Sequence, residues 1–217
     1  RFVLNRIVDP AEEARLTALL AEHGQEPLRL PFDAAAYARA GWDTGLIPAG
    51  LLTGPALPRL ADETRGRLWH ATWARKNRAV MNNNGARNAA LAWGRASGAR
   101  WILPWDGNCF LTAAAWQALS AAVRARPELP CFVTPMARIA DNAALLDPAF
   151  APEAAEEPQI LFRADTTETF DAAFAYGRRP KVELFWRLGI PGPWDKWHDA
   201  PWDPPRRPPS PDRGRFA

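Results

Sequence analysis

The stretch from residue 77 to residue 119 decides the fold, and its sequence is NRAVMNNNGARNAALAWGRASGARWILPWDGNCFLTAAAWQAL. Apolar runs and helical patterns alternate along it, as they do in α/β proteins. The pattern predicts a strand over 78–81, a loop over 82–85, a helix over 86–98, a buried strand over 99–105 that ends at Asp106, and a helix over 111–125. Strands followed by helices indicate a layered α/β core.

The N-terminal residues extend this pattern. A short strand is predicted over 2–8, a helix over 11–24 and a second strand over 27–32. Asp9 and Pro10 suit the beginning of that helix, because Asp caps helices and Pro fits their first turn. A strand, a helix and a strand within about thirty residues form a βαβ unit, whose strands run parallel.

Downstream segments complete the expected domain. A helical segment is predicted over 64–76, strands over 130–136 and 159–163, a loop over 141–158 and a helix over 181–189. Residues beyond 199 are rich in proline and lack apolar periodicity, which is typical of an extended or disordered segment. We therefore expect one domain over 1–198 and a Pro-rich tail over 199–217.

Composition excludes several classes of protein. A chain of 217 residues, 47% hydrophobic and 24% charged, is typical of one soluble globular domain. No apolar run reaches the ~18 residues that a membrane-spanning helix needs. The net charge of +3 comes without a dense basic stripe, so no nucleic-acid partner is expected. Cys109 and Cys131 show no zinc-binding spacing and are expected to be buried free thiols, which favours a reducing, cytoplasmic compartment.

Two segments place polar groups where α/β sheets bind ligands. The loop over 82–85 precedes a helix that opens with Ala86-Arg87-Asn88, and the strand over 99–105 is followed by Asp106-Gly107-Asn108. Ligands of open α/β sheets bind at the carboxyl ends of strands, where loops and helix N-termini converge. A carboxylate there suits Mg²⁺ or Mn²⁺, which bridges two phosphates and stabilises a departing diphosphate.

The order and spacing of these motifs resemble the GT-A glycosyltransferases, family 2-like members of the nucleotide-diphospho-sugar transferase superfamily. In that family, N-x-G, A-R-N, a short helix and a strand ending in D-x-D follow one another, and FVLNR over 2–6 is similar to the first strand. The resemblance implies a GT-A-like (Rossmann-like) three-layer α/β/α sandwich with a mostly parallel central sheet. It also implies a nucleoside-diphosphate sugar as donor, a divalent metal (Mn²⁺ or Mg²⁺), and an acceptor that is a glycan, a lipid or a protein.

The family's site residues carry over by position. Asp106 matches the first carboxylate of D-x-D and is expected to meet the metal or the ribose, whereas Asn108 stands where the second Asp usually lies. Asparagine coordinates through a neutral carbonyl oxygen, so weaker metal binding is expected. The residues expected on the nucleotide side are Asn5, Arg6, Asp33, Asn84, Gly85, Arg87 and Asn88.

The general base is the position where the chain departs from the family. Residues 181–189, KVELFWRLG, resemble the E-D-x-x-L-x-x-R-L helix, but the acid pair falls on Pro180 and Lys181. Glu183 and Asp165 are the candidate substitutes, and ordinary surface roles explain them as well. Four further candidates are His198 for the metal, Arg178 and Arg179 for the diphosphate, and Trp105 for stacking, with surface or packing roles as alternatives.

Three functions are compatible with these residues. The first is a metal-assisted glycosyltransferase. The second is a GT-A-like binding or accessory domain of a larger protein that has lost turnover, which Asn108 and the missing acid pair favour. The third is a nucleotidyltransferase, and it ranks lowest because Asn5-Arg6 stand where a Gly-rich loop is expected.

Overall fold

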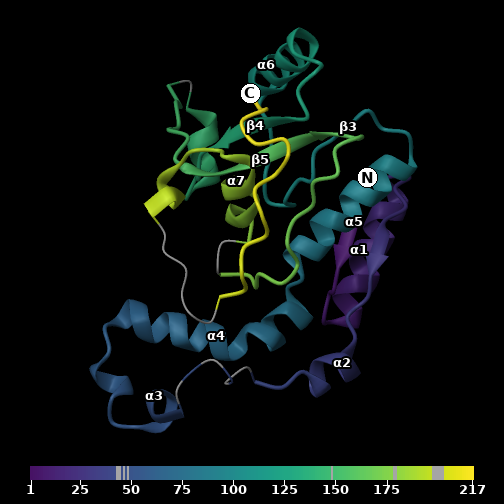
Figure 1. Cartoon of the computed structure of the whole chain (residues 1–217). Helices are drawn as coiled ribbons and strands as arrows, with labels where there is room; N and C mark the ends of the chain where they lie inside the picture. Colours follow the sequence, from purple (N-terminus) through teal and green to yellow (C-terminus); the bar gives the residue numbers. More distant parts are fainter. Residues whose placement is uncertain (43–44, 46, 48, 148, 178–179, 197–202) are drawn as a thin grey trace. The chain divides into compact units, whose positions relative to one another are not determined.

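The computed structural model describes residues 1–217 except 43–44, 46, 48, 148, 178–179 and 197–202 (Figure 1). The chain divides into two compact units. Unit 1 consists of Arg1–Ala89, Phe170–Leu184 and Pro191–Pro208, and unit 2 consists of Ala90–Thr169, Phe185–Ile190 and Pro209–Ala217. Helices and strands occur together, so the predicted mixed α/β class is confirmed.

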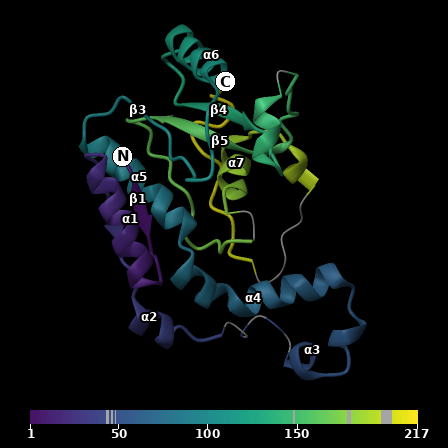
Figure 2. The ribbon, with the colours of Figure 1, turned by 180° about the vertical axis from the view of Figure 1, so that it is seen from behind.

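Unit 1 begins with the predicted βαβ unit. It consists of β1 (Val3–Asn5), α1 (Pro10–Glu22) and β2 (Leu28–Leu30). The two strands pair in parallel, as expected, and α1 lies alongside them in both Figure 1 and Figure 2. The carboxylate of Asp9 accepts a hydrogen bond from the backbone N–H of Ala11 at 2.8 Å, so this residue caps α1 as the sequence predicts.

The other regular elements that the structure describes within the first 89 residues are helices. The helices are α2 (Ala34–Arg39), α3 (Ala49–Thr53), the 3-10 helix η1 (Leu57–Arg59), α4 (Asp62–Val80) and the first part of α5 (Asn83–Ala96). The predicted strand over 78–81 is wrong, because α4 continues through it. Leu68, Ala71 and Thr72 are buried at helical spacing, and tertiary packing of this face sustains the long helix.

The predicted loop over 82–85 is also wrong. The backbone N–H of Met81 still bonds to the carbonyl of Asn77 at 2.8 Å, and α5 begins at Asn83. Only Asn82, with a φ of 41°, leaves the helical conformation. Asparagine tolerates this left-handed region better than most residues, so one residue suffices to separate the two helices.

Unit 2 contains a three-stranded antiparallel sheet. Its order is β3 (Trp101–Ile102), β5 (Glu156–Arg163) and β4 (Cys131–Met136). Among the described strands, the parallel pairing that was expected to dominate occurs only between β1 and β2. In the described part of the connection from β4 to β5, the one regular element is the 3-10 helix η2 (Asn142–Leu146). A parallel pair needs a longer crossover, usually helical.

Helix α6 (Ala113–Ala125) confirms the prediction over 111–125 and covers the core of unit 2. Its Leu119 packs with Leu129, Phe132 and Leu161, which come from the end of the following loop and from the sheet. Figure 2 shows α6 beside the end of β4. The core of this unit therefore lies between one face of the sheet and α6.

The C-terminal residues add to the same sheet. Phe216 forms a parallel bridge with Cys131, and the N–H of Val133 bonds to the carbonyl of Ala217 at 2.7 Å. These residues come from the segment that the sequence places in a Pro-rich tail. The remaining elements are α7 (Val182–Leu188), which confirms the predicted helix, and the 3-10 helix η3 (Pro193–Lys196). Within the described residues, no helix combines the length and apolar character needed to cross a bilayer.

Candidate functional site

The Asp106-Gly107-Asn108 motif forms a turn after β3 in unit 2. Pro104 follows the strand closely and helps to end it, since proline cannot donate to a sheet. The turn closes through a hydrogen bond of 2.9 Å from the N–H of Cys109 to the carbonyl of Asp106. The Trp105 indole N–H donates to the carbonyl of Cys109 at 2.8 Å. Gly107 and Asn108 are exposed, so the turn presents its middle residues to solvent.

The Asp106 carboxylate is half-buried and oriented by the sheet. Gln159, a buried residue of β5, donates from Nε2 to Oδ2 of Asp106 at 3.0 Å. This bond holds one carboxylate oxygen in a fixed direction. Gln159 was missed by sequence reasoning, although a glutamine inside the apolar strand QILFR is a signal, because a buried amide needs a polar partner.

Asn84 points into unit 1. Only 2% of this residue is exposed. Its amide donates to the carbonyls of Asp171 and Pro180 at 2.7 and 2.8 Å, and its Oδ1 accepts from Nη1 of Arg87 at 3.0 Å. Both amide hydrogens and the carbonyl oxygen are therefore used within the protein.

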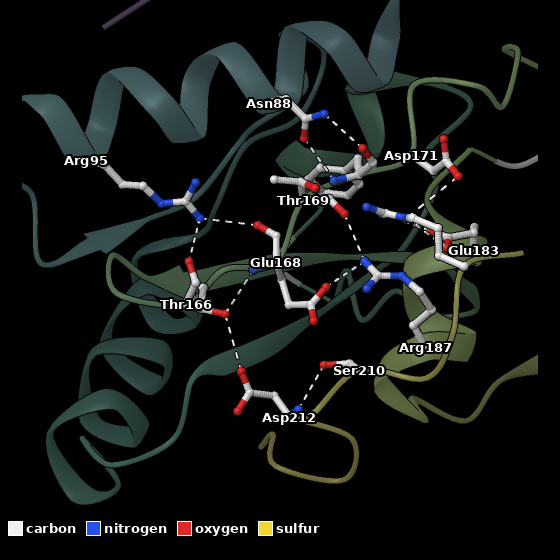
Figure 3. A network of polar contacts seen from close by, with 12 residues as sticks. Asn88, Arg95, Thr166, Glu168, Thr169, Asp171, Glu183, Arg187, Ser210 and Asp212 are labelled. Atoms are coloured by element: carbon white, nitrogen blue, oxygen red, sulfur yellow. Dashed lines mark hydrogen bonds and ion pairs between the residues drawn. The ribbon is translucent and has the colours of Figure 1, made fainter.

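Asn88 and Arg87 contact Phe170, the neighbour of the Asp171 residue that Asn84 contacts. Asn88 donates to the carbonyl of Phe170 at 2.8 Å and accepts from its N–H at 2.9 Å (Figure 3). The Arg87 guanidinium lies 5.6 Å from the centre of the Phe170 ring, a cation–π distance. The A-R-N motif thus binds the chain around Phe170 through one turn of α5.

The end of β1 is fastened to the end of α4. Asn5 donates to the carbonyl of Met81 at 2.7 Å and accepts from Nδ2 of Asn82 at 3.1 Å. Arg6, whose φ of 48° lies in the left-handed region, donates to the carbonyls of Arg78 and Ala79 at 2.7 and 2.8 Å. Arginine at a helix C-terminus satisfies free carbonyls and complements the helix dipole. Asn5 and Arg6, both predicted to bind the nucleotide, therefore contact residues 78–82. Gly85, another predicted residue, lies against the side chain of Asn82 in the same region.

Asp33, the last residue predicted near the nucleotide, caps a helix. Its Oδ1 accepts from the N–H of Ala36 at 2.8 Å at the beginning of α2. Asp33 is exposed, and it therefore contacts solvent as well as capping α2. Its proposed contact with a base stays a prediction.

Glu183 lies fully buried on α7 within unit 1. The guanidinium of Arg207 contacts both of its carboxylate oxygens at 3.3 Å. Arg207 also lies 3.7 Å from Oδ2 of Asp171. A forked arginine contact of this kind neutralises a buried carboxylate. Proton acceptance by Glu183 therefore requires that its contact with Arg207 change.

Asp165, the other candidate base, is exposed in unit 2. It accepts a hydrogen bond of 2.6 Å from Nε of Arg163. This hydrogen bond, together with the arginine charge, lowers the pKa of Asp165 and raises that of Arg163. A carboxylate with a lowered pKa accepts protons weakly. An open depression of about 490 Å³ borders Asp165, with Arg100 and Pro127 in its lining.

The predicted site residues fall in both units. Trp105, Asp106, Asn108 and Asp165 belong to unit 2, and the predicted nucleotide residues and Glu183 belong to unit 1. Arg178, Arg179 and His198 lie outside the described residues. In the part of the chain that the structure describes, no three His, Cys, Asp or Glu side chains gather to hold a metal ion.

A second polar network in unit 2 was missed by sequence reasoning (Figure 3). Buried Glu168 and Arg187 form an ion pair of 2.6 Å, and Arg187 also donates to the carbonyl of Thr169 at 3.0 Å. Arg95 donates to the carbonyls of Thr166 and Glu168 at 2.9 and 3.2 Å. The available signal was the position of Arg187 beside the apolar Leu188 on α7, since a charge on a buried helix face needs a partner.

No family model, curated protein or solved structure matches this chain.

Proposed function

We propose that this protein binds a nucleoside-diphosphate sugar on a GT-A-like three-layer α/β/α fold and transfers the sugar to an acceptor. The observation that supports this most is the Asp106 turn. A carboxylate stands at the carboxyl end of a strand, is oriented by a buried glutamine, and is followed by an exposed glycine and asparagine. Open parallel α/β sheets bind phosphorylated ligands at strand ends of this kind, and the motif resemblance assigns the diphosphate to this turn.

The side chains of this turn suit a divalent metal. Asp106 supplies a carboxylate and Asn108 an exposed amide, and both offer the oxygen ligands that Mg²⁺ and Mn²⁺ prefer. Such ions are commonly held by one or two carboxylates together with the substrate's phosphates, so two protein ligands suffice. The bound ion would stabilise the negative charge of the departing diphosphate. Asp106 would keep the ion at the strand end, and Gly107, with open space around its Cα, would let the diphosphate approach the backbone.

A second candidate is a binding domain that does not turn over, and Glu183 favours it. This glutamate is buried against Arg207, and the other candidate base, Asp165, has a lowered pKa because of Arg163. Neither carboxylate is poised to accept a proton from an acceptor hydroxyl. We also propose a cytoplasmic location, which the two free cysteines support.

A ligand screen followed by a product assay tests both candidates. Nucleoside diphosphates and their sugars are added with and without Mn²⁺, and the melting temperature is recorded. A specific ligand raises it through mass action, and we expect a metal-dependent rise for at least one nucleoside diphosphate. Sugar transfer or hydrolysis of that donor identifies the transferase, whereas saturable binding without product identifies the binding domain. No shift with any donor would contradict both.

A further inference from the structure

Unit 2 contains an open depression whose lining includes no residue of the Asp106 turn. Its volume is about 490 Å³, which lies within the usual range for sites that bind small molecules. The lining consists of Arg100, Pro127, Arg163, Ala164 and Asp165. Two arginines therefore border a hollow that is large enough for a small ligand, and we call it the Arg100–Arg163 depression.

Arg163 is held in one orientation within this depression. Its Nε donates to Oδ1 of Asp165 at 2.6 Å, and its Nη1 donates to the carbonyls of Pro127 and Glu128 at 3.1 and 2.7 Å. Among the described residues, Nη2 of Arg163 has no hydrogen-bond acceptor, and 25% of the side chain is exposed. Because the guanidinium is already fixed, it loses little conformational entropy when Nη2 binds an anion.

Arg100 supplies a second cation immediately before β3. The backbone N–H of Ala164 donates to the carbonyl of Arg100 at 2.9 Å, and Trp101 pairs with Arg163 in the sheet. This pairing brings Arg100 beside the residue that follows Arg163. Arg100 is exposed, and its guanidinium forms no hydrogen bond or ion pair with the part of the chain that the structure describes.

The charges around the depression favour an anion. The negative charges of two further acids act on Arg163, but each of these acids has an arginine of its own. The pairs are Glu128 with Arg126 at 2.6 Å and Asp212 with Arg215 at 2.7 Å. Arg100 and Arg163 then face one remaining carboxylate, that of Asp165, so the lining carries an excess of one positive charge.

We propose that the Arg100–Arg163 depression binds a phosphate group, free or on a small molecule, without a metal ion. Guanidinium groups match the oxygens of phosphate, and a phosphate has enough oxygens to contact two arginines at once. A carboxylate has only two oxygens and a single charge, so it fits two arginines less well. Pro127 and Ala164 offer apolar surface to the remainder of a phosphorylated molecule.

Calorimetric titration in a metal-free buffer of low salt, without phosphate, tests the proposal. Inorganic phosphate and glycerol 3-phosphate are the probes, and acetate is the comparison. Near pH 7.5 phosphate carries almost two charges, so we expect it to bind at least about fivefold more tightly than acetate, and more weakly as salt is raised. Tighter binding of glycerol 3-phosphate would identify a phosphorylated molecule as the ligand, and tighter binding of inorganic phosphate would identify the free ion. Absence of binding by both probes, or equal binding of acetate, would overturn the proposal.

Two exposed positions allow variants with opposite expected effects. Arg100→Gln removes one cation and should weaken phosphate binding about fivefold. Asp165→Asn keeps an oxygen that accepts from Nε of Arg163 and removes the negative charge, so it should tighten phosphate binding about threefold. Arg124→Gln is the matched control, because Arg124 is an exposed arginine of α6 in the same unit that does not line the depression. This control should bind phosphate as the original chain does.

The same variants give the results that contradict the proposal. Equal losses in Arg100→Gln and Arg124→Gln would show that net charge governs binding and not the depression. Weaker binding in Asp165→Asn would show that the phosphate does not contact the arginines beside this carboxylate. Asp106→Ala should leave metal-free phosphate binding unchanged, so a failure of this proposal is distinct from a failure of the metal-dependent site at the Asp106 turn.

Discussion

Residues 82–88 and residues 105–109 belong to the same motif resemblance, yet the first segment buries polar side chains in unit 1 and the second exposes polar residues on unit 2. In the first segment, Asn84 and Asn88 donate to backbone carbonyls inside unit 1, namely those of Phe170, Asp171 and Pro180. In the second, Gly107 and Asn108 face solvent beside a carboxylate that is oriented by Gln159. The comparison teaches that one part of the stretch that resembles the GT-A motifs stabilises the scaffold, whereas the other part is exposed to solvent.

The largest difference in the free energy of unfolding is expected between alanine variants of two asparagines, one from each segment. Asn84→Ala removes three hydrogen bonds and leaves buried carbonyls without their donor, so the free energy of unfolding should fall by about 3 kcal/mol. Asn108→Ala, at an exposed position, should change it by less than about 0.5 kcal/mol. Denaturant unfolding of both variants measures the difference. Equal losses of stability in the two variants would contradict the claim that Asn84 supports the scaffold and Asn108 does not.

The sequence predicts helices and strands better than it predicts whether a polar side chain is buried or exposed. The helix over 111–125 follows from local periodicity, and Asp9 and Pro10 identify the beginning of α1. The destination of Asn84 does not follow from the sequence, because its partner Pro180 lies 96 residues away. The strand predicted over 78–81 was wrong for a related reason, since packing around Leu68 extends α4 beyond the local β preference.

A smaller difference in the free energy of unfolding is expected between alanine variants of two glycines, one from each segment. A methyl group at Gly85 would collide with the side chain of Asn82, which holds Asn5 at 3.1 Å, whereas Gly107 has open space around it. Gly85→Ala should therefore lower the free energy of unfolding by about 1 kcal/mol, in spite of the better helix propensity of alanine. Gly107→Ala should stay within about 0.5 kcal/mol of the original chain. A Gly85 variant that is more stable than the original would refute the close packing of Asn82.

The two cysteines provide a contrast in reactivity. Burial raises the pKa of the Cys131 thiol to about 12, whereas Cys109 lies half-buried at the end of the Asp106 turn. The folded protein should therefore be alkylated at Cys109 first, and Cys109→Ser should remove this labelling, as measured by mass spectrometry. Because the folded-state pKa of Cys131 is raised, its contribution to stability is present near neutral pH and is lost as the pH rises toward that value. Equal labelling rates would contradict the placement of Cys131 on a buried strand.

Calorimetric titration of Asp106→Ala tests the central claim most directly. The ligand is the nucleoside diphosphate or sugar nucleotide that gives the largest metal-dependent shift in melting temperature, and Mn²⁺ is present throughout. Glu153→Ala, which removes an exposed acid from the same unit, is the matched control. We predict that the Asp106 variant loses binding by at least about a hundredfold, as expected when a metal-holding carboxylate is removed, while the control binds as the original chain does. Unchanged affinity in the Asp106 variant would contradict the assignment of this turn as the diphosphate site.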